Sequence, residues 1–279
     1  MSAAILQHDW LGACRASAQA LERILSGSRA GTERTVETGN RGEGGDQTLV
    51  IDADAEEAVF VELARLHDAG ARFTAVSEER GSVDFGGDGV IVLVDPIDGS
   101  LNAKRGLHSH AISIAVADGP TMADVLFAYV YDYGSREEWR ALRGEGALLN
   151  DAPLDDPAPE RRTKDGRLEI VCIESAAPRW LARASDGLVE HVHRVRALGS
   201  VAISLCQVAP PRVDGMCSLT PSRAVDGAAA QLIVREAGGL VAYPGFDDPL
   251  AAPLDLYPHS PVVAARTPDG LARLIEIVG

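Results

Sequence analysis

Two aspartates stand three residues apart directly after an apolar segment of the sequence. Residues 89–94 read Gly-Val-Ile-Val-Leu-Val, and Asp95-Pro96-Ile97-Asp98 follow them. The apolar run predicts a buried strand, and Pro96 ends its ladder because proline has no N–H group to donate. A turn here can bring the carboxylates of Asp95 and Asp98 together, with the backbone carbonyl of Ile97 between them. Oxygen ligands of these kinds suit Mg²⁺ and Mn²⁺, so the segment predicts a site for a hard divalent cation.

The next two residues add an anion-binding feature to this turn. Gly99 permits a tight turn, and Ser100 can cap a short helix. The free N–H groups at a helix N-terminus attract anions such as phosphate. The segment therefore predicts a cation site beside a phosphate site. A simpler interpretation stays open, in which Asp95 and Asp98 only complete a turn and a helix cap.

Acidic residues elsewhere in the chain could join this site. Glu78 follows a predicted strand over residues 72–76 and could add a carboxylate edge. Asp52 and Glu56 stand four apart at the start of a predicted helix, and Asp226 begins a later one. Helix N-termini favour negative charge, so a purely structural role is an equal alternative for the acids on helices.

The overall charge of the chain is strongly negative. It has 279 residues, 46% of them hydrophobic, with 26 basic and 41 acidic residues and a formal net charge of −15. Such a surface repels a phosphate backbone, which argues against general nucleic-acid binding. It would also repel a phosphorylated substrate unless cations intervene, so the charge and the predicted cation site agree.

The apolar segments are too short and too interrupted for a membrane span, and the first residues do not resemble a secretory signal. We therefore expect a cytoplasmic protein. Its four cysteines form no CxxC pair and are predicted to be buried thiols; they are Cys14, Cys172, Cys206 and Cys217.

The elements that must position the acids differ between the two halves of the chain. Strands are predicted in the first half at residues 72–76, 89–94, 111–116 and 125–131. Residues 151–166 turn rich in Asp, Pro and Arg, which suggests a boundary. Beyond it strands and helices alternate, from a strand at 168–173 to a last helix beginning at Pro268, and this pattern predicts a layered α/β arrangement.

Five segments of the chain together resemble the inositol monophosphatase superfamily of metal-dependent, lithium-sensitive phosphatases. In the family's order they are IDADAE (51–56), SEERG (77–81), DPIDGSLN (95–102), RALGSVAISLCQVA (196–209) and RAVDGAAAQLIVREAGG (223–239). DPIDGS is the family signature, and the matching region covers most of the chain. The SEE, DGS and R-x-x-D forms are similar to the archaeal-type branch, whose members often hydrolyse inositol 1-phosphate and fructose 1,6-bisphosphate.

The resemblance implies a fold and a division of the chain. The fold would be of the α/β (α+β) class, a layered α-β-α-β-α sandwich. Residues 1–155 would form an N-terminal α+β half that carries most metal ligands. Residues 156–279 would form a C-terminal α/β half that completes the metal and substrate site. A homodimer is expected, as in most of the family.

The resemblance also assigns metal ligands, for two or three Mg²⁺ or Mn²⁺ ions in each active site. Glu78, Asp95 and the Ile97 carbonyl would hold the first, activating ion. Asp95, Asp98 and Asp226 would hold the second, near the leaving oxygen. A weaker third ion would depend on Glu78 and water. The ions would neutralise the phosphate dianion and activate water for in-line attack, without a phosphoenzyme.

Further roles carry over to residues beside the metals. Ser100, where the family more often has threonine, would orient the attacking water together with Glu78, and Asp52 would support its hydroxyl. The N–H groups of Gly99 and Ser100 would bind the phosphate. Gly199 and Ser200 match the segment that contacts the alcohol portion of the substrate.

The sequence departs from the family pattern at places that bear on the substrate. Val225 precedes the late aspartate where Trp is frequent, and Leu219 stands where many inositol-preferring members have an acid. The segment 26–46, expected to be a loop or hairpin, lacks the lysine often found near its end. These departures weaken the case for an inositol phosphate as the main substrate.

Other functions stay open at this point. Within the enzyme class, the substrate could be histidinol phosphate or 3′-phosphoadenosine 5′-phosphate. A catalytically weak sensor of phosphorylated ligands or metals could use the same scaffold, although its acidic set would then be expected to lose a member. In the simplest alternative, the aspartates only cap helices.

Overall fold

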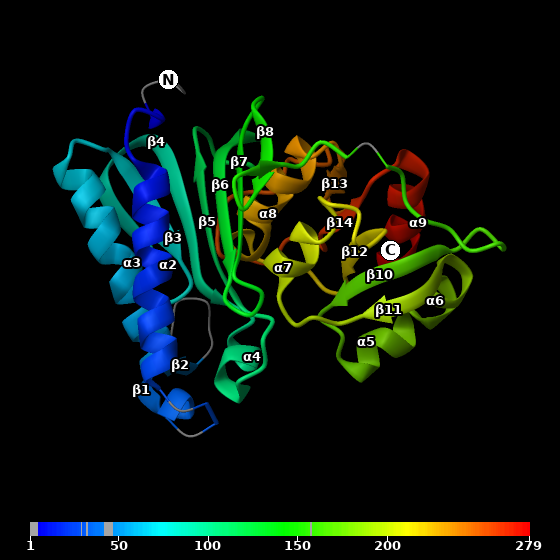
Figure 1. The fold of residues 1–279 in the computed structure, drawn as a ribbon, viewed down its shortest axis with the longest axis horizontal. Helices are drawn as coiled ribbons and strands as arrows, with labels where there is room; N and C mark the ends of the chain where they lie inside the picture. The colour runs from blue at the N-terminus through cyan, green and yellow to red at the C-terminus, as the bar shows by residue number, and fades with distance from the viewer. Residues whose placement is uncertain (1–4, 29, 32, 42–46, 157) are drawn as a thin grey trace.

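Two large β-sheets alternate with three layers of helices in the described part of the molecule (Figure 1). The computed structural model describes residues 5–28, 30–31, 33–41, 47–156 and 158–279. From one side to the other the layers are a helix pair, a seven-stranded sheet, a second helix pair, a five-stranded sheet and a last group of helices. This α-β-α-β-α order confirms the predicted fold class.

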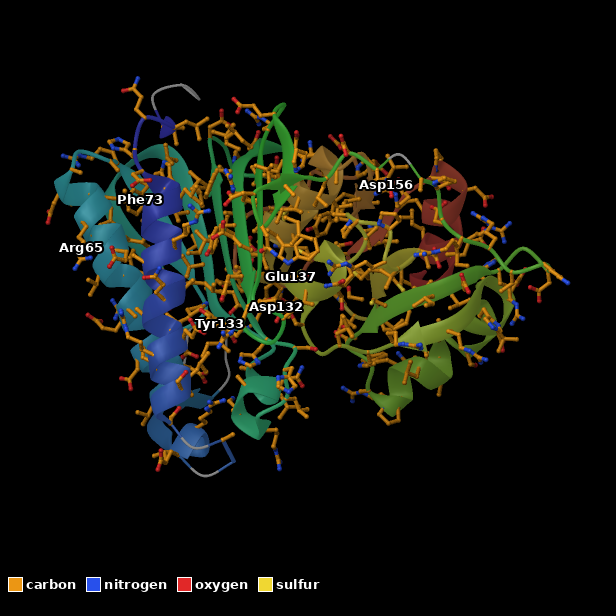
Figure 2. The ribbon with its side chains drawn as sticks, in the orientation of Figure 1. Arg65, Phe73, Asp132, Tyr133, Glu137 and Asp156 are labelled. Carbon is orange, nitrogen blue, oxygen red and sulfur yellow. The ribbon has the colours of Figure 1, made fainter. Side chains whose placement is uncertain are left out.

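The seven-stranded sheet is built from residues of the first half of the chain. Its strands, in spatial order, are β3 (Phe73–Ser77), β4 (Gly81–Asp98), β5 (Ala111–Ala117), β6 (Val125–Asp132), β7 (Glu137–Leu142), β8 (Gly146–Leu149) and β9 (Ala152–Pro153). Helices α2 (Trp10–Gly27) and α3 (Val50–Asp68) cover one face. Trp10 packs edge-on against Phe73 with ring centroids 5.5 Å apart, and Figure 2 labels Phe73 beside α2.

The long strand β4 has two arms that lie on opposite sides of β3. Residues 81–85 run antiparallel to β3, and residues 91–94 run parallel to it. The second arm is the predicted apolar strand, and its residues 92–94 are at most 1% exposed. Burial on both faces explains why this arm reads as a continuous apolar run. This arm leads directly into Asp95, which is buried.

The five-stranded sheet belongs to the second half of the chain. Its strands, in spatial order, are β11 (Val192–Arg196), β10 (Leu168–Glu174), β12 (Gly215–Ser218), β14 (Val263–Ala265) and β13 (Leu240–Ala242). Strand β10 runs parallel to both β11 and β12, and β14 is antiparallel to its neighbours. Its outer helices are α5 (Pro178–Arg183), α6 (Ser185–His191) and α9 (Pro268–Val278). The alternation of strands and helices was predicted, but several boundaries move by one to three residues and helix α6 was not predicted.

Helices α7 (Val201–Cys206) and α8 (Ala224–Glu236) lie between the two sheets. Helix α8 belongs to the second half but packs on β5 and β6 of the first, and one apolar cluster includes residues of both sheets. A small residue also lets α8 pack closely against its own half: a Cβ atom on Gly227 would lie 3.1 Å from the hydroxyl of Tyr243, which follows β13. The two halves therefore share one core.

Glu137 and Glu138 begin strand β7 and bind basic residues of other segments. Both Glu137 oxygens accept hydrogen bonds from Arg212 at 2.7 Å, which links the first half to the second. Figure 2 shows Glu137 close to Asp132, its partner in the seven-stranded sheet. Arg15 of α2 pairs with Glu138 at 2.6 Å.

Shorter elements complete the described chain: η1 (Glu33–Thr35), β1 (Glu37–Arg41), β2 (Gln47–Leu49), α4 (Ser100–Arg105) and η2 (Met122–Asp124). Strands β1 and β2 pair antiparallel, as expected for a hairpin, while residues 29, 32 and 42–46 of the segment 26–46 lie outside the described residues. The four cysteines are buried and free, as predicted. Among the described helices, none is long and apolar enough to cross a membrane.

Candidate active site

The two aspartates of the signature lie on either side of a bulge at the end of β4. Asp95 faces Ser113 of β5 and Asp98 faces Ala111, so two residues bulge out opposite one. Both aspartates are buried, with Asp95 3% and Asp98 7% exposed. The N–H of Ile97 donates to Asp95 Oδ1 at 3.0 Å. The predicted turn therefore brings both carboxylates to one end of the strand.

Asp98 is held by the start of helix α7. The Ser200 hydroxyl and the N–H of Ala202 both donate to its Oδ2, the latter at 2.7 Å, and the N–H of Val201 lies 3.4 Å from Oδ1. Ser200 is 1% exposed and also caps the helix by accepting from Ile203 N at 3.1 Å. Its hydroxyl therefore binds Asp98, and a contact of Ser200 with substrate stays a prediction.

Glu78 and Asp226 lie on either side of an arginine that was part of the quoted sequence pattern but had no predicted role. Arg223 Nη1 donates to Glu78 Oε1 at 2.8 Å, and its Nε lies 3.8 Å from Asp226 Oδ1. The backbone N–H of Arg223 also donates to Asp226 Oδ2 at 3.1 Å, since Asp226 closes the first turn of α8. These contacts bring the turn after β3 against the N-terminus of α8.

The four acids form a region of concentrated negative charge. Burial, followed by repulsion from Asp98, Glu78 and Asp226, raises the pKa of Asp95 well above its usual value. Burial raises the pKa of Asp98 to about 6, against the effect of its hydrogen bonds from α7. Burial also raises the pKa of Asp226 to about 7; Arg223 opposes this shift, and Asp98 and Glu78 add to it. A cation among these groups would relieve the cost of ionising them.

The residues present fit a hard divalent ion, although they do not form a finished cage. Within the described chain, no three acidic, histidine or cysteine side chains already stand in coordinating geometry. Instead, one carboxylate oxygen of Glu78 and one of Asp98 accept hydrogen bonds from protein groups. The donor set is made of oxygen only, as Mg²⁺ and Mn²⁺ prefer. Directly across the ladder from Asp95, the buried Ser113 hydroxyl has no hydrogen-bond partner among the described residues, so a polar ligand could still be accommodated there.

Two glycines bring the signature turn against the loop before α7. Gly99 has a φ of +85°, and a Cβ atom there would lie 2.9 Å from the Gly199 carbonyl oxygen. Gly199 has a φ of +81°, and its Cβ would lie 2.6 Å from Asn102 Nδ2. Ser100 begins helix α4 directly after this contact. Only glycine fits both positions without strain.

Two acids of α3 reach the turns that carry the site. Asp52 lies 3.7 Å from Lys104 Nζ on α4, the helix that Ser100 begins. Its predicted support of the Ser100 hydroxyl stays a prediction. Glu56 is 2% exposed and accepts from the N–H groups of Glu79 and Arg80, each at 3.3 Å. Glu56 therefore fixes the turn that presents Glu78.

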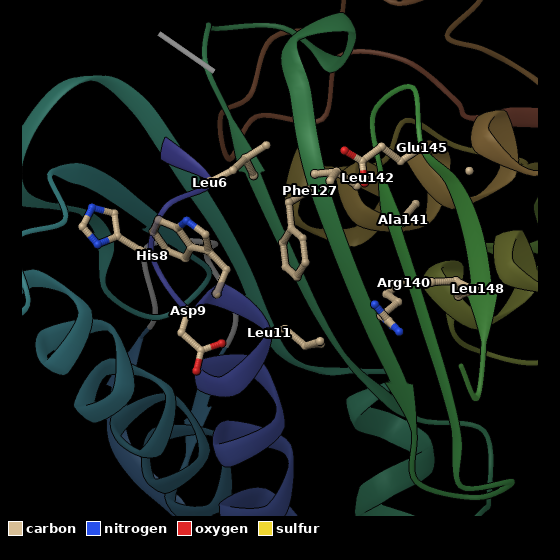
Figure 3. A pocket seen from close by; sticks show the side chains of 12 residues that line it. Leu6, His8, Asp9, Leu11, Phe127, Arg140, Ala141, Leu142, Glu145 and Leu148 are labelled. Carbon is tan, nitrogen blue, oxygen red and sulfur yellow. The ribbon is translucent and has the colours of Figure 1, made fainter. Parts of the chain in front are cut away.

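A cavity of about 400 Å³ opens beside Asp98. It is lined by Asp98, Asn102, Glu174, Ser175, Ala176, Ala197, Leu198, Gly199 and Val201. A separate pocket of about 260 Å³, drawn in Figure 3, lies between the N-terminus of α2 and the strands β6 to β8. Figure 3 shows apolar side chains such as Phe127 and Leu142 around it, and none of the predicted site residues lines it.

The layered fold and the buried oxygen-rich cluster between its sheets define a class of metal-dependent phosphatases. The model of the inositol monophosphatase family matches residues 7–278. The chain therefore belongs to the inositol monophosphatase family, and it is a metal-dependent phosphatase of that family.

Named relatives agree with this assignment. The chain is 34% identical to the fructose-1,6-bisphosphatase/inositol-1-monophosphatase of Methanothermobacter thermautotrophicus, over 83% of each chain. It is 34% identical to the inositol-1-monophosphatase of Mesorhizobium japonicum, over 71% of this chain and 72% of the relative. It is also 33% identical to a protein named Nus factor SuhB from Pasteurella multocida, over 70% and 71% of the two chains.

Solved structures show the same fold. The extragenic suppressor protein suhB from Bartonella henselae matches with a TM-score of 0.76 at 24% identity, over 96% of this chain and 97% of that one. The inositol monophosphatase from Anabaena matches with a TM-score of 0.71 at 21% identity, over 96% and 94% of the chains.

Proposed function

We propose that the protein is a Mg²⁺-dependent phosphomonoesterase that hydrolyses a small polyol or sugar phosphate. The observation that carries the proposal is the cluster of Glu78, Asp95, Asp98 and Asp226, four acids from three separate segments with one arginine among them. Among the described residues, Arg223 is the cation that opposes the repulsion at Asp95 and Asp226, and further cations would stabilise the cluster. Family membership supports the same chemistry.

The residues would divide the work as follows. Glu78, Asp95 and the Ile97 carbonyl would hold one ion, and Asp95, Asp98 and Asp226 a second, with two or three Mg²⁺ or Mn²⁺ ions in all. When bound, such ions neutralise the phosphate, lower the pKa of water and stabilise the leaving oxygen. Hydrolysis by in-line attack then needs positioning more than covalent help from the protein.

The remaining predicted residues would position the reactants. The N–H groups of Gly99 and Ser100 would bind the phosphate, because the turn at Gly99 leaves them at the start of α4. The Ser100 hydroxyl would orient the attacking water with Glu78, supported by Asp52. Gly199 lines the cavity beside Asp98, which supports its predicted contact with the alcohol portion of the substrate.

The substrate is inositol 1-phosphate, fructose 1,6-bisphosphate, or both. The cavity of about 400 Å³ suits an alcohol of sugar size. Relatives named fructose-1,6-bisphosphatase/inositol-1-monophosphatase support this pair of substrates. Leu219, which replaces a possible acidic partner for inositol hydroxyls, favours the sugar phosphate.

Further properties are proposed from the family. The protein would be a cytoplasmic homodimer, and Li⁺ would inhibit it at the second metal position. A role other than hydrolysis is the second candidate, because several relatives carry the name Nus factor SuhB. The intact acidic set favours hydrolysis over that role.

A panel of phosphomonoesters tests the proposal. Phosphate release from inositol 1-phosphate, fructose 1,6-bisphosphate, histidinol phosphate and 3′-phosphoadenosine 5′-phosphate is measured with Mg²⁺, with Mn²⁺ and with a chelator, and then with Li⁺ added. We expect the highest kcat/KM for one of the first two esters, and no turnover in the chelator. Equal rates with Mg²⁺ and chelator, or no release from any ester, would reject the proposal.

A further inference from the structure

Glu174 is a buried carboxylate at the end of β10 that the proposed reaction does not use. Its side chain is 4% exposed. It accepts hydrogen bonds from the N–H of Leu198 at 3.0 Å, from the N–H of Gly199 at 3.1 and 3.2 Å, and from the Ser204 hydroxyl at 2.6 Å. One carboxylate thus binds both ends of the segment 198–204.

This segment is the one that holds Asp98. Between the two ends that Glu174 binds, the Ser200 hydroxyl and the Ala202 N–H both donate to Asp98 Oδ2. Ser204 lies in the same short helix α7 that Ser200 caps. A shift of the segment would therefore move the donors that orient Asp98.

The same segment forms one wall of the cavity beside Asp98. Asn102 Nδ2 donates to the Leu198 carbonyl at 2.7 Å, and a Cβ on Gly99 would lie 2.9 Å from the Gly199 carbonyl oxygen. Both contacts leave little room for displacement, so the position of the segment 198–204 sets the distance between this wall and the signature turn.

We propose that Glu174 is a positioning residue for the phosphatase reaction. It fixes the segment 198–204, and that segment both orients Asp98 for cation binding and shapes the substrate cavity. This inference rests on the function proposed above.

The carboxylate is required because every group that faces it in these hydrogen bonds is a donor. A carboxylate accepts through both oxygens, whereas the amide of glutamine accepts through one and donates through its NH₂ group. In Glu174→Gln the NH₂ group would face the N–H of Gly199 or the Ser204 hydroxyl. The substitution therefore keeps the volume and disrupts the hydrogen bonds.

Asp214 provides a matched control; it directly precedes β12 and binds the first half of β10, whereas Glu174 ends that strand. Asp214 is 1% exposed and accepts from the N–H of Arg161 at 2.7 Å and of Ile170, in β10, at 2.8 Å. Asp214→Asn also replaces a buried carboxylate that binds two backbone N–H groups, but it does so away from Asp98. If Glu174 were only structural, the two variants should change Mg²⁺ binding and kcat/KM to a similar extent.

The experiment compares wild type, Glu174→Gln and Asp214→Asn in the full chain. Three quantities are measured: the Kd for Mg²⁺ by calorimetry, kcat and KM for fructose 1,6-bisphosphate, and amide hydrogen exchange. For Glu174→Gln we expect the Kd for Mg²⁺ to rise by about 10-fold or more and kcat/KM to fall by about 10-fold or more. Effects of this size are common for residues that orient metal ligands. Exchange should accelerate at residues 198–202. Asp214→Asn should lower the melting temperature while Kd and kcat/KM stay within about 2-fold of wild type.

The inference is overturned if Glu174→Gln leaves the Kd for Mg²⁺ unchanged, or if Asp214→Asn weakens Mg²⁺ binding equally. Should Glu174→Gln fail to fold, Ser204→Ala removes one donor only, and a Kd for Mg²⁺ raised about 3-fold is then expected, against an unchanged Kd if the inference is wrong. Wild-type protein without phosphatase activity would reject the proposed function instead. The exchange at residues 198–202 would still decide whether Glu174 fixes that segment.

Discussion

Buried acids occur in two regions of this molecule, and their surroundings differ. In the C-terminal half, Glu160 accepts from the N–H groups of Arg266 and Thr267 at 2.9 and 2.6 Å, and Asp214 accepts from two N–H groups in the same way. Between the sheets, Asp95 accepts a backbone hydrogen bond from Ile97 and is repelled by three other acids. Both regions bury carboxylates, but among the described residues only the acids between the sheets are raised in pKa by repulsion from one another.

The comparison separates structural acids from functional ones without reference to a motif. A buried carboxylate that backbone donors satisfy stabilises the fold. A buried carboxylate that faces other carboxylates destabilises the protein until a cation joins it, so its presence indicates a site. Glu174 is a structural acid by its contacts, because donors satisfy it. The segment that it binds, however, holds Asp98 of the acid cluster.

Asp95→Asn should produce the largest change in activity. The substitution removes a ligand shared by both proposed ions, so kcat should fall by at least about 100-fold. The melting temperature without metal should stay the same or rise, because repulsion from the other acids is removed. Steady-state kinetics and differential scanning calorimetry check this. An unchanged kcat would place the acid cluster among the structural acids.

The acid cluster should also make stability depend on pH and Mg²⁺ together. Asp98 and Asp226 have pKa values raised to about 6 and about 7 in the folded protein, above about 3.9 in an unfolded chain. Their contribution to the free energy of unfolding is fully present below the unfolded pKa and is lost as the pH rises to about 7. Mg²⁺ binds the deprotonated carboxylates, so it should replace the lost stability at high pH.

The measurement is the gain in melting temperature on adding Mg²⁺ to chelator-treated protein. The gain should be larger at about pH 7.5 than at about pH 5, because protons compete with the metal at the lower pH. Asp214→Asn should show the same pH dependence as wild type. A gain that is constant with pH would contradict the raised pKa values.

Much of the fold and of the acid cluster could be predicted from the sequence. The strand before Asp95, the segments of the acid cluster and the alternation in the second half all follow from apolar patterns and from motifs. Strands β7 to β9 were not predicted, because Glu137 and Glu138 gave no alternating pattern that signals a strand. Glu174 was missed because one glutamate at a strand end carries no local signal; its partners lie 24 to 30 residues away.

Glu160→Gln should lower stability without lowering activity. The variant weakens hydrogen bonds to the start of α9, and the expected loss is about 1–3 kcal/mol in the free energy of unfolding. Urea unfolding measures that loss, and kcat/KM for fructose 1,6-bisphosphate should remain within about 2-fold of wild type. A large loss of activity at full stability would erase the distinction between the two regions.

Arg223→Gln should have a small effect on stability. It tests the acid cluster by removing a cation from it, whereas the variants above remove acids. Without the guanidinium, Glu78 and Asp226 lose the cationic partner that they share among the described residues. We expect a loss of about 1 kcal/mol in metal-free protein. The gain in melting temperature on adding Mg²⁺ should increase correspondingly. Arg212→Gln, which breaks the Glu137 pair on the surface, is the matched control and should leave the Mg²⁺ gain unchanged.

The central claim is that the four acids between the two sheets bind divalent cations. Crystals soaked in Mn²⁺ and measured at the manganese absorption edge test it directly. We predict anomalous peaks about 2.1 Å from carboxylate oxygens of Asp95, with at least one peak also reached by Asp98 or Asp226. Soaked crystals with full Mn²⁺ exposure and no peak among these acids would contradict it.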